Sequence, residues 1–402
     1  MRRKIVSTWG VSSYFGWGVY GLNLALAWAN DPDVELVCAA GIRRQDIALD
    51  AIRLGSLSRA IDQSAKLRAQ LAQMTGAVTV HTPMLSGLNA DLRPWSAAKN
   101  LALTGTPSVG VTFFETALHS PEAIESASRL PLILTGSTWN ERVLRAYGLT
   151  NVRTVLQGVD PLLFHPAPPV PRTDGRFRVF SGGKLELRKG QDLVVAAFRK
   201  FADRHPDAVL VAAWHSPWPQ FARGVEKSNL TAPVVFGADG RLDPAGWAAA
   251  NGLRPEQFID AGQTPNALMP QLLRQIDVAL FPNRCEGGTN LVAMECMACG
   301  VPTILSANTG HLDLIEEDNC FALTRQEPVT FEPAAAACGE TPGWGESDVD
   351  EAVELLERAY RDREDARRRG ASGAATLSRY PWSRTASEVK AAVLEVCAAQ
   401  GL

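Results

Sequence analysis

The sequence DVALFPNRCEGGTNLVAMECMACG, residues 277–300, contains a strand, a turn and a helix in direct succession. Its first six residues predict a buried strand, the Gly-Gly pair predicts a turn, and the apolar run that begins at Leu291 predicts a helix. Thr289 or Asn290 is placed to cap that helix. The capped end would then lie at the carboxyl edge of a parallel sheet, which is where open α/β sheets bind ligands.

Short apolar runs alternate with helix-like stretches on both sides of this unit, which is the pattern of parallel sheets covered by helices. In the first half, strands are predicted at residues 4–9, 34–40, 77–82, 108–114, 132–137 and 152–157. In the second half, they are predicted at residues 177–182, 208–214, 234–238, 257–262, 277–282 and 302–307. The predicted fold class is therefore α/β, with two doubly wound, Rossmann-like domains that face each other across a cleft.

A proline-rich segment separates the two halves. Residues 164–175 contain four prolines and a glycine, which cannot continue a helix or a central strand, so we interpret them as a linker. The predicted domains are residues 1–166 and residues 175–382. The end of the chain is helical by pattern, with a break at residues 380–383, and we expect the last helix, about 383–402, to join the first domain.

Composition excludes several classes of protein. The chain has 402 residues with a net charge of −3, so it has no broad basic surface and nucleic acid is a poor candidate partner. No apolar run approaches the roughly 18 to 20 residues that span a bilayer, although peripheral membrane contact stays compatible with the sequence. Seven cysteines, an odd number scattered along the chain, indicate reduced thiols and a cytoplasmic location.

A glycine-rich motif lies near the start of the chain. GWGVYG, residues 16–21, matches G-x-G-x-x-G and opens a predicted helix. The dinucleotide fingerprint also requires a tight turn after the strand and an acid after the second strand, but six residues separate Trp9 from the first glycine and that acid is missing. Arg43 and Arg44 could accept a 2′-phosphate, which keeps an NADP-dependent enzyme as an alternative. We interpret the loop as a place where acceptor or donor phosphate approaches the backbone at a helix N-terminus.

The second half opens with a basic turn. In SGGKLELRKG, residues 181–190, paired glycines end a predicted strand and expose backbone N–H groups. Lys184 and Lys189 bring two ammonium groups to the same turn. Fixed donors and cations together suit a diphosphate, because they offset the charge that grows on a departing nucleotide.

Two acidic residues belong to the strand–turn–helix unit of residues 277–300. Glu286 precedes the helix and Glu295 lies within it, so one could accept sugar hydroxyls and the other ribose hydroxyls. Cys296 and Cys299 form C-x-x-C inside the same apolar helix. No second cysteine pair has zinc-site spacing, so these two cysteines are predicted to pack in the core.

As a set, these segments resemble the retaining GT-B glycosyltransferases, in particular the large family that contains sucrose-phosphate synthases and bacterial mannosyl- and glucosyltransferases. Residues 183–190 resemble its G-R-L-x-x-x-K-G segment, with Lys184 in place of the usual arginine. Residues 286–300 resemble its E-x7-E segment that ends E-A-M-A-C-G. Residues 157–166 resemble its G-V-D-x-x-x-F-x-P entry to the second domain. The resemblance covers the chain from about residue 132 to 323.

The resemblance implies transfer of a sugar from a nucleotide-sugar donor with retention of anomeric configuration and without a required metal. The first domain would hold the acceptor and the second the donor. Lys184 and Lys189, with helix N–H groups, would stabilise the leaving group, and Glu295 would bind the ribose. One departure concerns Glu286, because eight residues separate it from Glu295 where the family has seven.

The family also implies a histidine or acid of the first domain near the anomeric carbon. His81 ends one predicted strand and Glu115 follows another, so both would lie at carboxyl strand ends that face the cleft. The predicted catalytic residues are Lys184, Lys189, Glu286, His81 and Glu115. The predicted donor-binding residues are Gly16, Gly18, Gly183, Gly287, Gly288, Thr289, Asn290, Leu291 and Glu295. No cofactor is expected apart from the nucleotide-sugar co-substrate.

Other functions on the same architecture stay open at this point. A sugar-nucleotide epimerase would release free sugar or nucleotide without an acceptor, and a non-catalytic sugar-nucleotide binder would tolerate the altered acidic spacing. An NADP-dependent oxidoreductase rests only on the first glycine motif. The base and sugar of the donor are not readable from the sequence, nor is the acceptor, which could be a saccharide, a small molecule, a lipid or a protein.

Overall fold

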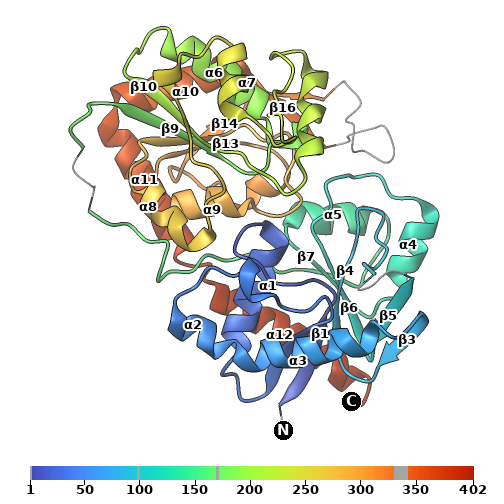
Figure 1. Cartoon of the computed structure of the whole chain (residues 1–402). Helices are drawn as coiled ribbons and strands as arrows, with labels where there is room; N and C mark the ends of the chain where they lie inside the picture. The colour runs from blue at the N-terminus through green and yellow to red at the C-terminus, as the bar shows by residue number, and fades with distance from the viewer. Residues whose placement is uncertain (1, 97–99, 169–171, 330–342) are drawn as a thin grey trace.

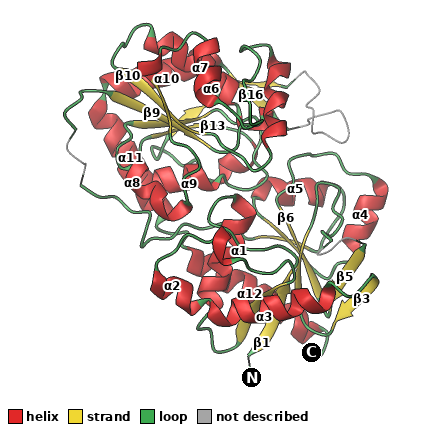
Figure 2. Ribbon diagram, in the orientation of Figure 1, coloured by secondary structure: helices red, strands yellow, loops and turns green. Residues whose placement is uncertain are grey.

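Two lobes, each built on a six-stranded parallel sheet with helices packed around it, make up the molecule (Figures 1 and 2). The computed structural model describes residues 2–96, 100–168, 172–329 and 343–402. The predicted α/β class with two doubly wound sheets is confirmed. Pro169, Val170 and Pro171 of the predicted linker lie outside the described residues.

The first sheet has the strand order β2-β1-β4-β6-β7-β8. Its strands are β1 (Arg3–Ser7), β2 (Val34–Cys38), β4 (Met84–Gly87), β6 (Ser108–Thr112), β7 (Ile133–Thr135) and β8 (Val152–Thr154). The helices of this lobe are α1 (Gly16–Trp28), α2 (Ala51–Ser56), α3 (Ser58–Leu71), α4 (Pro121–Ser128) and α5 (Thr138–Ala146). The strand order reverses between β1 and β4, so a ligand crevice is expected above the carboxyl ends of these strands.

The second sheet repeats this arrangement in the order β11-β10-β9-β12-β13-β14. Its strands are β9 (Phe177–Gly182), β10 (Ala208–Ala213), β11 (Phe258–Asp260), β12 (Val278–Phe281), β13 (Thr303–Ser306) and β14 (Phe321–Leu323). Its helices are α6 (Gln191–Ala202), α7 (Pro244–Ala250), α8 (Met269–Leu273), α9 (Leu291–Ala298), α10 (Val349–Arg361) and α11 (Arg363–Leu377). Here the order reverses between β9 and β12, the two strands that precede the basic turn and the Gly-Gly turn.

Two of the predicted strands are not part of the six-stranded sheets. The run predicted at 77–82 forms β3 (Gly76–Val80), which pairs with β5 (Leu101–Gly105) in a separate two-stranded sheet. The strand next to β1 is β4, which is buried along its whole length although it ends in a serine and a glycine. Residues 234–238 form no strand, because their only ladder contact is an isolated bridge between Phe236 and Leu242.

The C-terminal helix α12 (Trp382–Ala399) returns to the first lobe, where Figure 1 shows it beside α1. It begins directly after Pro381, at the predicted break. The indole Nε1 of Trp28 donates to the carbonyl of Ala386 (3.3 Å), and Lys390 pairs with Asp31 (2.8 Å). The expected return of the last helix to the first domain is thus present, while the exact domain boundaries stay a prediction.

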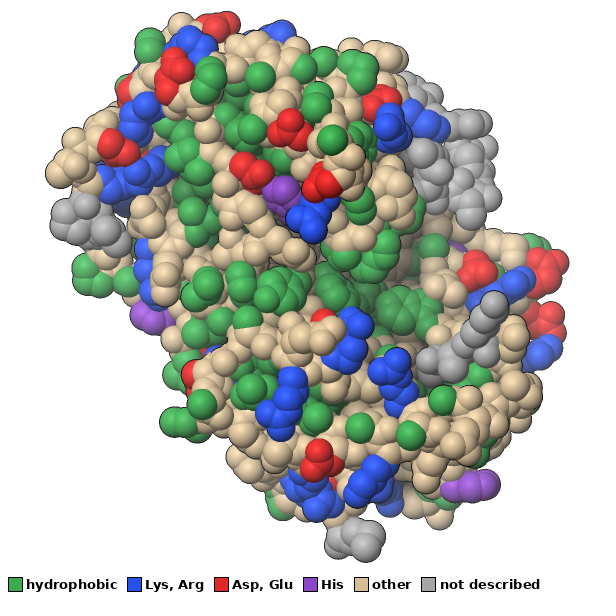
Figure 3. All heavy atoms as spheres, viewed as in Figure 1, with side chains coloured by type: hydrophobic (Ala, Val, Ile, Leu, Met, Phe, Trp, Pro, Cys, Tyr) green, Lys and Arg blue, Asp and Glu red, His purple; other side chains and the backbone are tan. Residues whose placement is uncertain are grey.

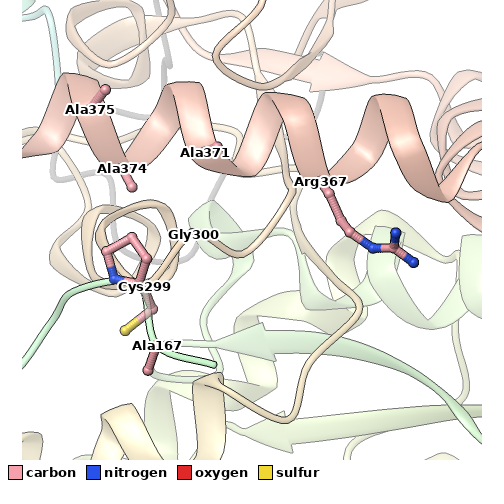
Figure 4. A pocket seen from close by; sticks show the side chains of 8 residues that line it. Ala167, Cys299, Gly300, Arg367, Ala371, Ala374 and Ala375 are labelled. Carbon is pink, nitrogen blue, oxygen red and sulfur yellow. The ribbon is translucent and has the colours of Figure 1, made fainter. Parts of the chain in front are cut away.

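Small residues let α11 cross the end of α9 closely. A Cβ on Gly370 would lie 2.2 Å from the carbonyl oxygen of Gly300, so the two backbones are in contact. Figure 4 shows α11 passing over Cys299 and Gly300, beside a hollow of ≈ 410 Å³ to which α11 contributes three alanines and Arg367. Cys296 and Cys299 are both buried with free thiols, in agreement with the predicted core packing.

The lobes also contact each other directly around the cleft. The Ser137 hydroxyl donates to the carbonyl of Gly287 (2.7 Å), and the backbone N–H of Thr138 donates to the carboxylate of Asp313 (2.8 Å). Strands β15 (Gln326–Pro328) and β16 (Gly345–Ser347) form a small antiparallel pair of the second lobe. Next to it, Trp344 donates its indole N–H to the carbonyl of Glu115 in the first lobe (2.6 Å).

Candidate active site

A pocket of ≈ 760 Å³ lies between the lobes, where the carboxyl ends of both sheets face each other. Both lobes contribute to its walls. In the space-filling view of Figure 3, the molecule is hollowed at the junction of the lobes, and hydrophobic side chains gather there. Pockets of this size at switch points of α/β sheets are the usual place for a substrate site.

The basic turn lies at this pocket as predicted. Gly183 follows β9 with a φ of +107°, a backbone conformation that favours glycine, and Lys184 and Lys189 line the pocket on either side of the turn. A short 3-10 helix, Leu187–Lys189, ends at Gly190, where an added Cβ would lie 2.2 Å from the carbonyl oxygen of Pro282. This close approach holds Lys189 against the end of β12.

Arg188 is a residue of this site that the sequence analysis did not assign. Its guanidinium lies 3.0 Å from the carboxylate of Glu115, 3.0 Å from that of Glu186 and 3.4 Å from that of Glu286. Arg188 also lines the pocket, so three cations meet there. The sequence shows Arg188 next to Lys189 in a basic turn. Such a pair does not reveal whether the arginine also points into the pocket.

Glu286 is buried among these cations. Its carboxylate pairs with Lys189 at 2.5 Å and accepts a hydrogen bond from the Asn283 amide. Burial alone would raise the pKa of Glu286, but Lys189 and Arg188 outweigh it and hold that pKa at about 2. Glu286 is therefore ionised, and it lines the pocket.

In the turn that follows Glu286, some of the predicted donor-binding residues line the pocket and others do not. Asn290, with a φ of +59°, caps α9 through its side-chain oxygen, and it lines the pocket together with Gly288 and Leu291. Thr289 is fully buried, and its hydroxyl contacts the sulfur of Met294 (3.0 Å), so its side chain does not line the pocket and its role in binding the donor stays a prediction.

Gly287 also faces away from the pocket. An added Cβ there would lie 2.2 Å from the carbonyl oxygen of Phe113 in the first lobe. Gly287 therefore makes the contact between the lobes and is not among the residues that line the cavity, while its donor contact stays a prediction. Glycine is required here because only a residue without a side chain lets the two backbones approach so closely.

Glu295 lies one helical turn deeper in α9 and also lines the pocket. The only hydrogen bond to its carboxylate that the described residues supply comes from the amide of Asn266. Burial raises the pKa of Glu295 to about 8, and the Asn266 amide lowers it only in part. A carboxyl group with so few partners at the edge of a cavity is suited to accept hydrogen bonds from ligand hydroxyls.

The N-terminal glycine motif serves packing more than ligand approach. Gly16 begins α1 and lines the pocket, but Gly18 does not, and a Cβ on Gly18 would lie 2.4 Å from Cβ of Ser12. A Cβ on Gly21 would lie 2.7 Å from the carbonyl oxygen of Gly10. The structure therefore gives Gly18 a packing role, in which it lets α1 approach the loop that follows β1, and its donor contact stays a prediction.

Of the two first-lobe candidates, only Glu115 is at the pocket. Its carboxylate crosses the cleft to Arg188. His81 follows β3 in the separate two-stranded sheet, its side chain is exposed, and it does not line the pocket. The prediction that His81 faces the cleft is wrong, because the strand before it is not part of the six-stranded sheet.

Comparison with known proteins decides the family. A family model described as "Family 4 Glycosyltransferase in conflict systems" matches residues 136–389. The chain belongs to the family 4 glycosyltransferases. The match includes the basic turn and the segment from Glu286 to Glu295 of this glycosyltransferase.

Two curated relatives are mannosyltransferases of Mycobacterium tuberculosis. This family 4 glycosyltransferase is 28% identical to a GDP-mannose-dependent alpha-(1-6)-phosphatidylinositol dimannoside mannosyltransferase, over 43% of this chain and 40% of that protein. It is 26% identical to a phosphatidyl-myo-inositol mannosyltransferase, over 77% of this chain and 70% of that protein. The chain thus spans less than half the length of the first of these relatives.

Solved structures share the fold over nearly the whole chain. The sucrose-phosphate synthase of Thermosynechococcus elongatus superposes with a TM-score of 0.63 at 15% identity, covering 99% of this chain and 100% of that one. Anabaena HepE in complex with UDP and glucose superposes with a TM-score of 0.57 at 14% identity, covering 98% and 100%. The arrangement of two facing lobes is therefore the GT-B fold.

Within the described residues, no cluster of three or more His, Cys, Asp or Glu side chains is placed to hold a metal ion. None of the described helices is both long and apolar enough to cross a membrane.

Proposed function

We propose that this protein transfers a sugar from a nucleoside-diphosphate sugar to an acceptor hydroxyl, with retention of anomeric configuration. The observation that carries this proposal is the convergence of Lys184, Arg188 and Lys189 with the N-terminus of α9 on one pocket between the lobes. Cations and helix N–H groups that face the same space suit the diphosphate of a donor, because both favour negative charge.

The charges of the site are balanced before any donor binds. Three cations, Lys184, Arg188 and Lys189, pair with three carboxylates, those of Glu115, Glu186 and Glu286. A diphosphate that enters would share these cations with the carboxylates. Its negative charge increases as the bond to the sugar breaks, so the pairing with the cations becomes stronger in the transition state than in the bound donor.

The reaction is balanced without a further reactant. The acceptor oxygen forms a bond to the anomeric carbon while the bond from that carbon to the diphosphate oxygen breaks. The electron pair of the broken bond stays on the diphosphate, which also takes the acceptor proton. Glu115 is the first-lobe group that we place near the sugar, where its negative charge would stabilise the positive charge that develops on the anomeric carbon.

The nucleoside is assigned to the second-lobe wall. Glu295 would accept hydrogen bonds from the ribose hydroxyls. Trp218 is 40% exposed beside the cation of Lys184, which lies 5.1 Å from its ring centroid, so its ring is accessible for stacking with a base. His215 lines the same wall and is held by Asp260 at 2.8 Å.

A thermal-shift screen tests this function. The protein is mixed separately with UDP, GDP, ADP, TDP and NADP, and we expect one nucleoside diphosphate to raise Tm by several degrees because it binds only the folded protein. The matching nucleotide sugar should then release its nucleoside diphosphate. Stabilisation by NADP alone would contradict the proposal, and release of nucleotide that never depends on an acceptor would favour an epimerase or hydrolase.

A further inference from the structure

The first-lobe wall of the pocket differs chemically from the second-lobe wall. Among its described residues, the first-lobe wall carries no lysine, arginine, histidine or aspartate. The one glutamate among them, Glu115, is paired with Arg188 across the cleft. Aromatic rings occupy the wall instead, in particular those of Trp17, Trp95 and Phe113. We call these three rings the aromatic platform.

The rings of the platform are packed against one another. The ring centroids of Trp17 and Trp95 are 4.5 Å apart, and those of Trp17 and Phe113 are 4.7 Å apart with the rings nearly perpendicular. All three side chains are only half-buried, so each is fixed by its neighbours while part of its surface faces the cavity. Rings held in this way lose little conformational entropy when a ligand packs on them.

The chain folds locally in a way that fixes Trp95. After β4, Leu88 pairs with Pro94 in an isolated bridge, and the backbone N–H of Trp95 donates to the carbonyl of Gly87 at 2.7 Å. A Cβ on Gly87 would lie 3.1 Å from the Trp95 ring, so the indole lies against bare backbone at the end of the strand. The loop therefore places the ring at the carboxyl edge of the sheet.

The aromatic platform adjoins the proposed diphosphate site. A Cβ on Gly288, in the turn before α9, would lie 3.1 Å from the ring of Phe113. Leu291, the first residue of α9, packs against the same hydrophobic cluster as the three rings. A ligand on the platform would therefore have one end close to the helix N-terminus where the sugar–phosphate bond is expected.

We propose that the aromatic platform receives the acceptor, and that the acceptor is uncharged and presents a flat ring face with mainly carbon and hydrogen atoms. This inference rests on the proposed glycosyltransferase function and adds the class of acceptor. Aromatic rings bind such a face through dispersion and burial of apolar surface. An acceptor that carries a phosphate next to the hydroxyl would meet no cation among the described residues of this wall and would lie beside Glu115.

The experiment compares acceptor probes on the full chain saturated with the nucleoside diphosphate found in the screen. Saturation-transfer NMR reports binding of 2-naphthalenemethanol, methyl β-D-glucopyranoside, glycerol and glucose 6-phosphate. We expect one or both of the neutral ring compounds to bind, with the strongest transfer to ring protons. Binding of the naphthalene compound alone indicates an aromatic acceptor, and binding of the glucoside alone indicates the face of a sugar ring. Stronger binding of glucose 6-phosphate, or no binding of either neutral ring, overturns the proposal.

Variants connect this binding to the platform. Trp95→Ala should weaken the neutral ring compound about tenfold and Trp95→Phe much less, because phenylalanine keeps an apolar ring. The Kd of the nucleoside diphosphate should stay unchanged in both variants, and Leu162→Ala, an exposed residue outside the pocket, should change neither. Unchanged ring binding in Trp95→Ala overturns the proposal. If no nucleoside diphosphate binds the wild type, the proposed function itself has failed, which is a separate result.

Discussion

The two walls of the cleft stand on sheets of equivalent topology but carry different chemistry. In both sheets the strand order reverses next to the first strand of the lobe, and the pocket lies at that reversal. The second-lobe wall presents three cations and two glutamates beside Trp218, whereas the first-lobe wall presents a glutamate, Glu115, among tryptophan and phenylalanine rings. The fold therefore supplies the position of the site, and the loops after the strands supply its chemistry.

This division predicts where substitutions will have their largest effect. Lys189→Ala should lower kcat by about 10³-fold, because the departing diphosphate loses a buried cation that is most strongly engaged in the transition state. Steady-state release of the nucleoside diphosphate measures this. The matched control is Lys200→Ala, which removes an exposed lysine paired with Asp350 outside the pocket and should leave kcat unchanged. Retention of wild-type turnover in Lys189→Ala would remove Lys189 from the site.

A substitution at the contact between the two walls should lower kcat almost as much as Lys189→Ala. Gly287→Ala places a methyl group 2.2 Å from the carbonyl oxygen of Phe113, so the lobes must move apart. We expect a loss of about 10²-fold in kcat, since a displacement of about 1 Å between reacting groups has that effect. Gly55→Ala is the matched control, because an added Cβ there meets no atom within 4 Å. Small-angle scattering that detects no change and an unaltered kcat would together contradict this role.

Glu115 is the charged group that the first lobe contributes to the site. Glu115→Gln should lower kcat about thirtyfold, because the amide keeps the shape but removes the charge that faces the anomeric carbon. The free energy of unfolding should change by less than about 1 kcal/mol, since the ion pair with Arg188 is partly exposed on the Glu115 side. Urea unfolding and kinetics on the same sample separate the two effects. A large loss of stability with normal kcat would assign Glu115 to lobe contact alone.

The smallest expected effect concerns Glu295 and depends on pH. Its pKa is raised to about 8 in the folded protein from 4.5, so between about pH 5 and pH 8 the folded state keeps a proton that the unfolded chain has released. Stability therefore falls as pH rises through this window, and Glu295→Gln should show a flatter dependence of Tm on pH. The same variant should bind the nucleoside diphosphate about tenfold more weakly. Parallel pH curves for both proteins would rule out the raised pKa.

Local sequence patterns were sufficient where one element carries the whole signal. The strand–turn–helix unit around Glu286 predicted the position of Asn290 and Glu295, because a helix cap and a helix period are properties of neighbouring residues. The basic turn similarly predicted Lys184 and Lys189. The third strand of the first sheet, β4, was not predicted, because its position depends on burial between other elements and not on a local pattern. Residues 77–82 are more strand-like than Met84–Gly87, but burial on both faces selected the latter.

The sequence alone was sufficient to predict the two α/β lobes and the two charged segments that line the second-lobe wall of the pocket. The packing of separate elements was needed to show that Arg188 joins Lys189, that Thr289 is buried and Gly287 contacts the first lobe, and that His81 lies outside the pocket. It also brought together Trp17, Trp95 and Phe113, which are far apart in the chain. The physical reason is that alternation, turns and caps are local, whereas the direction of a side chain and its neighbours across a cleft depend on how separate elements pack.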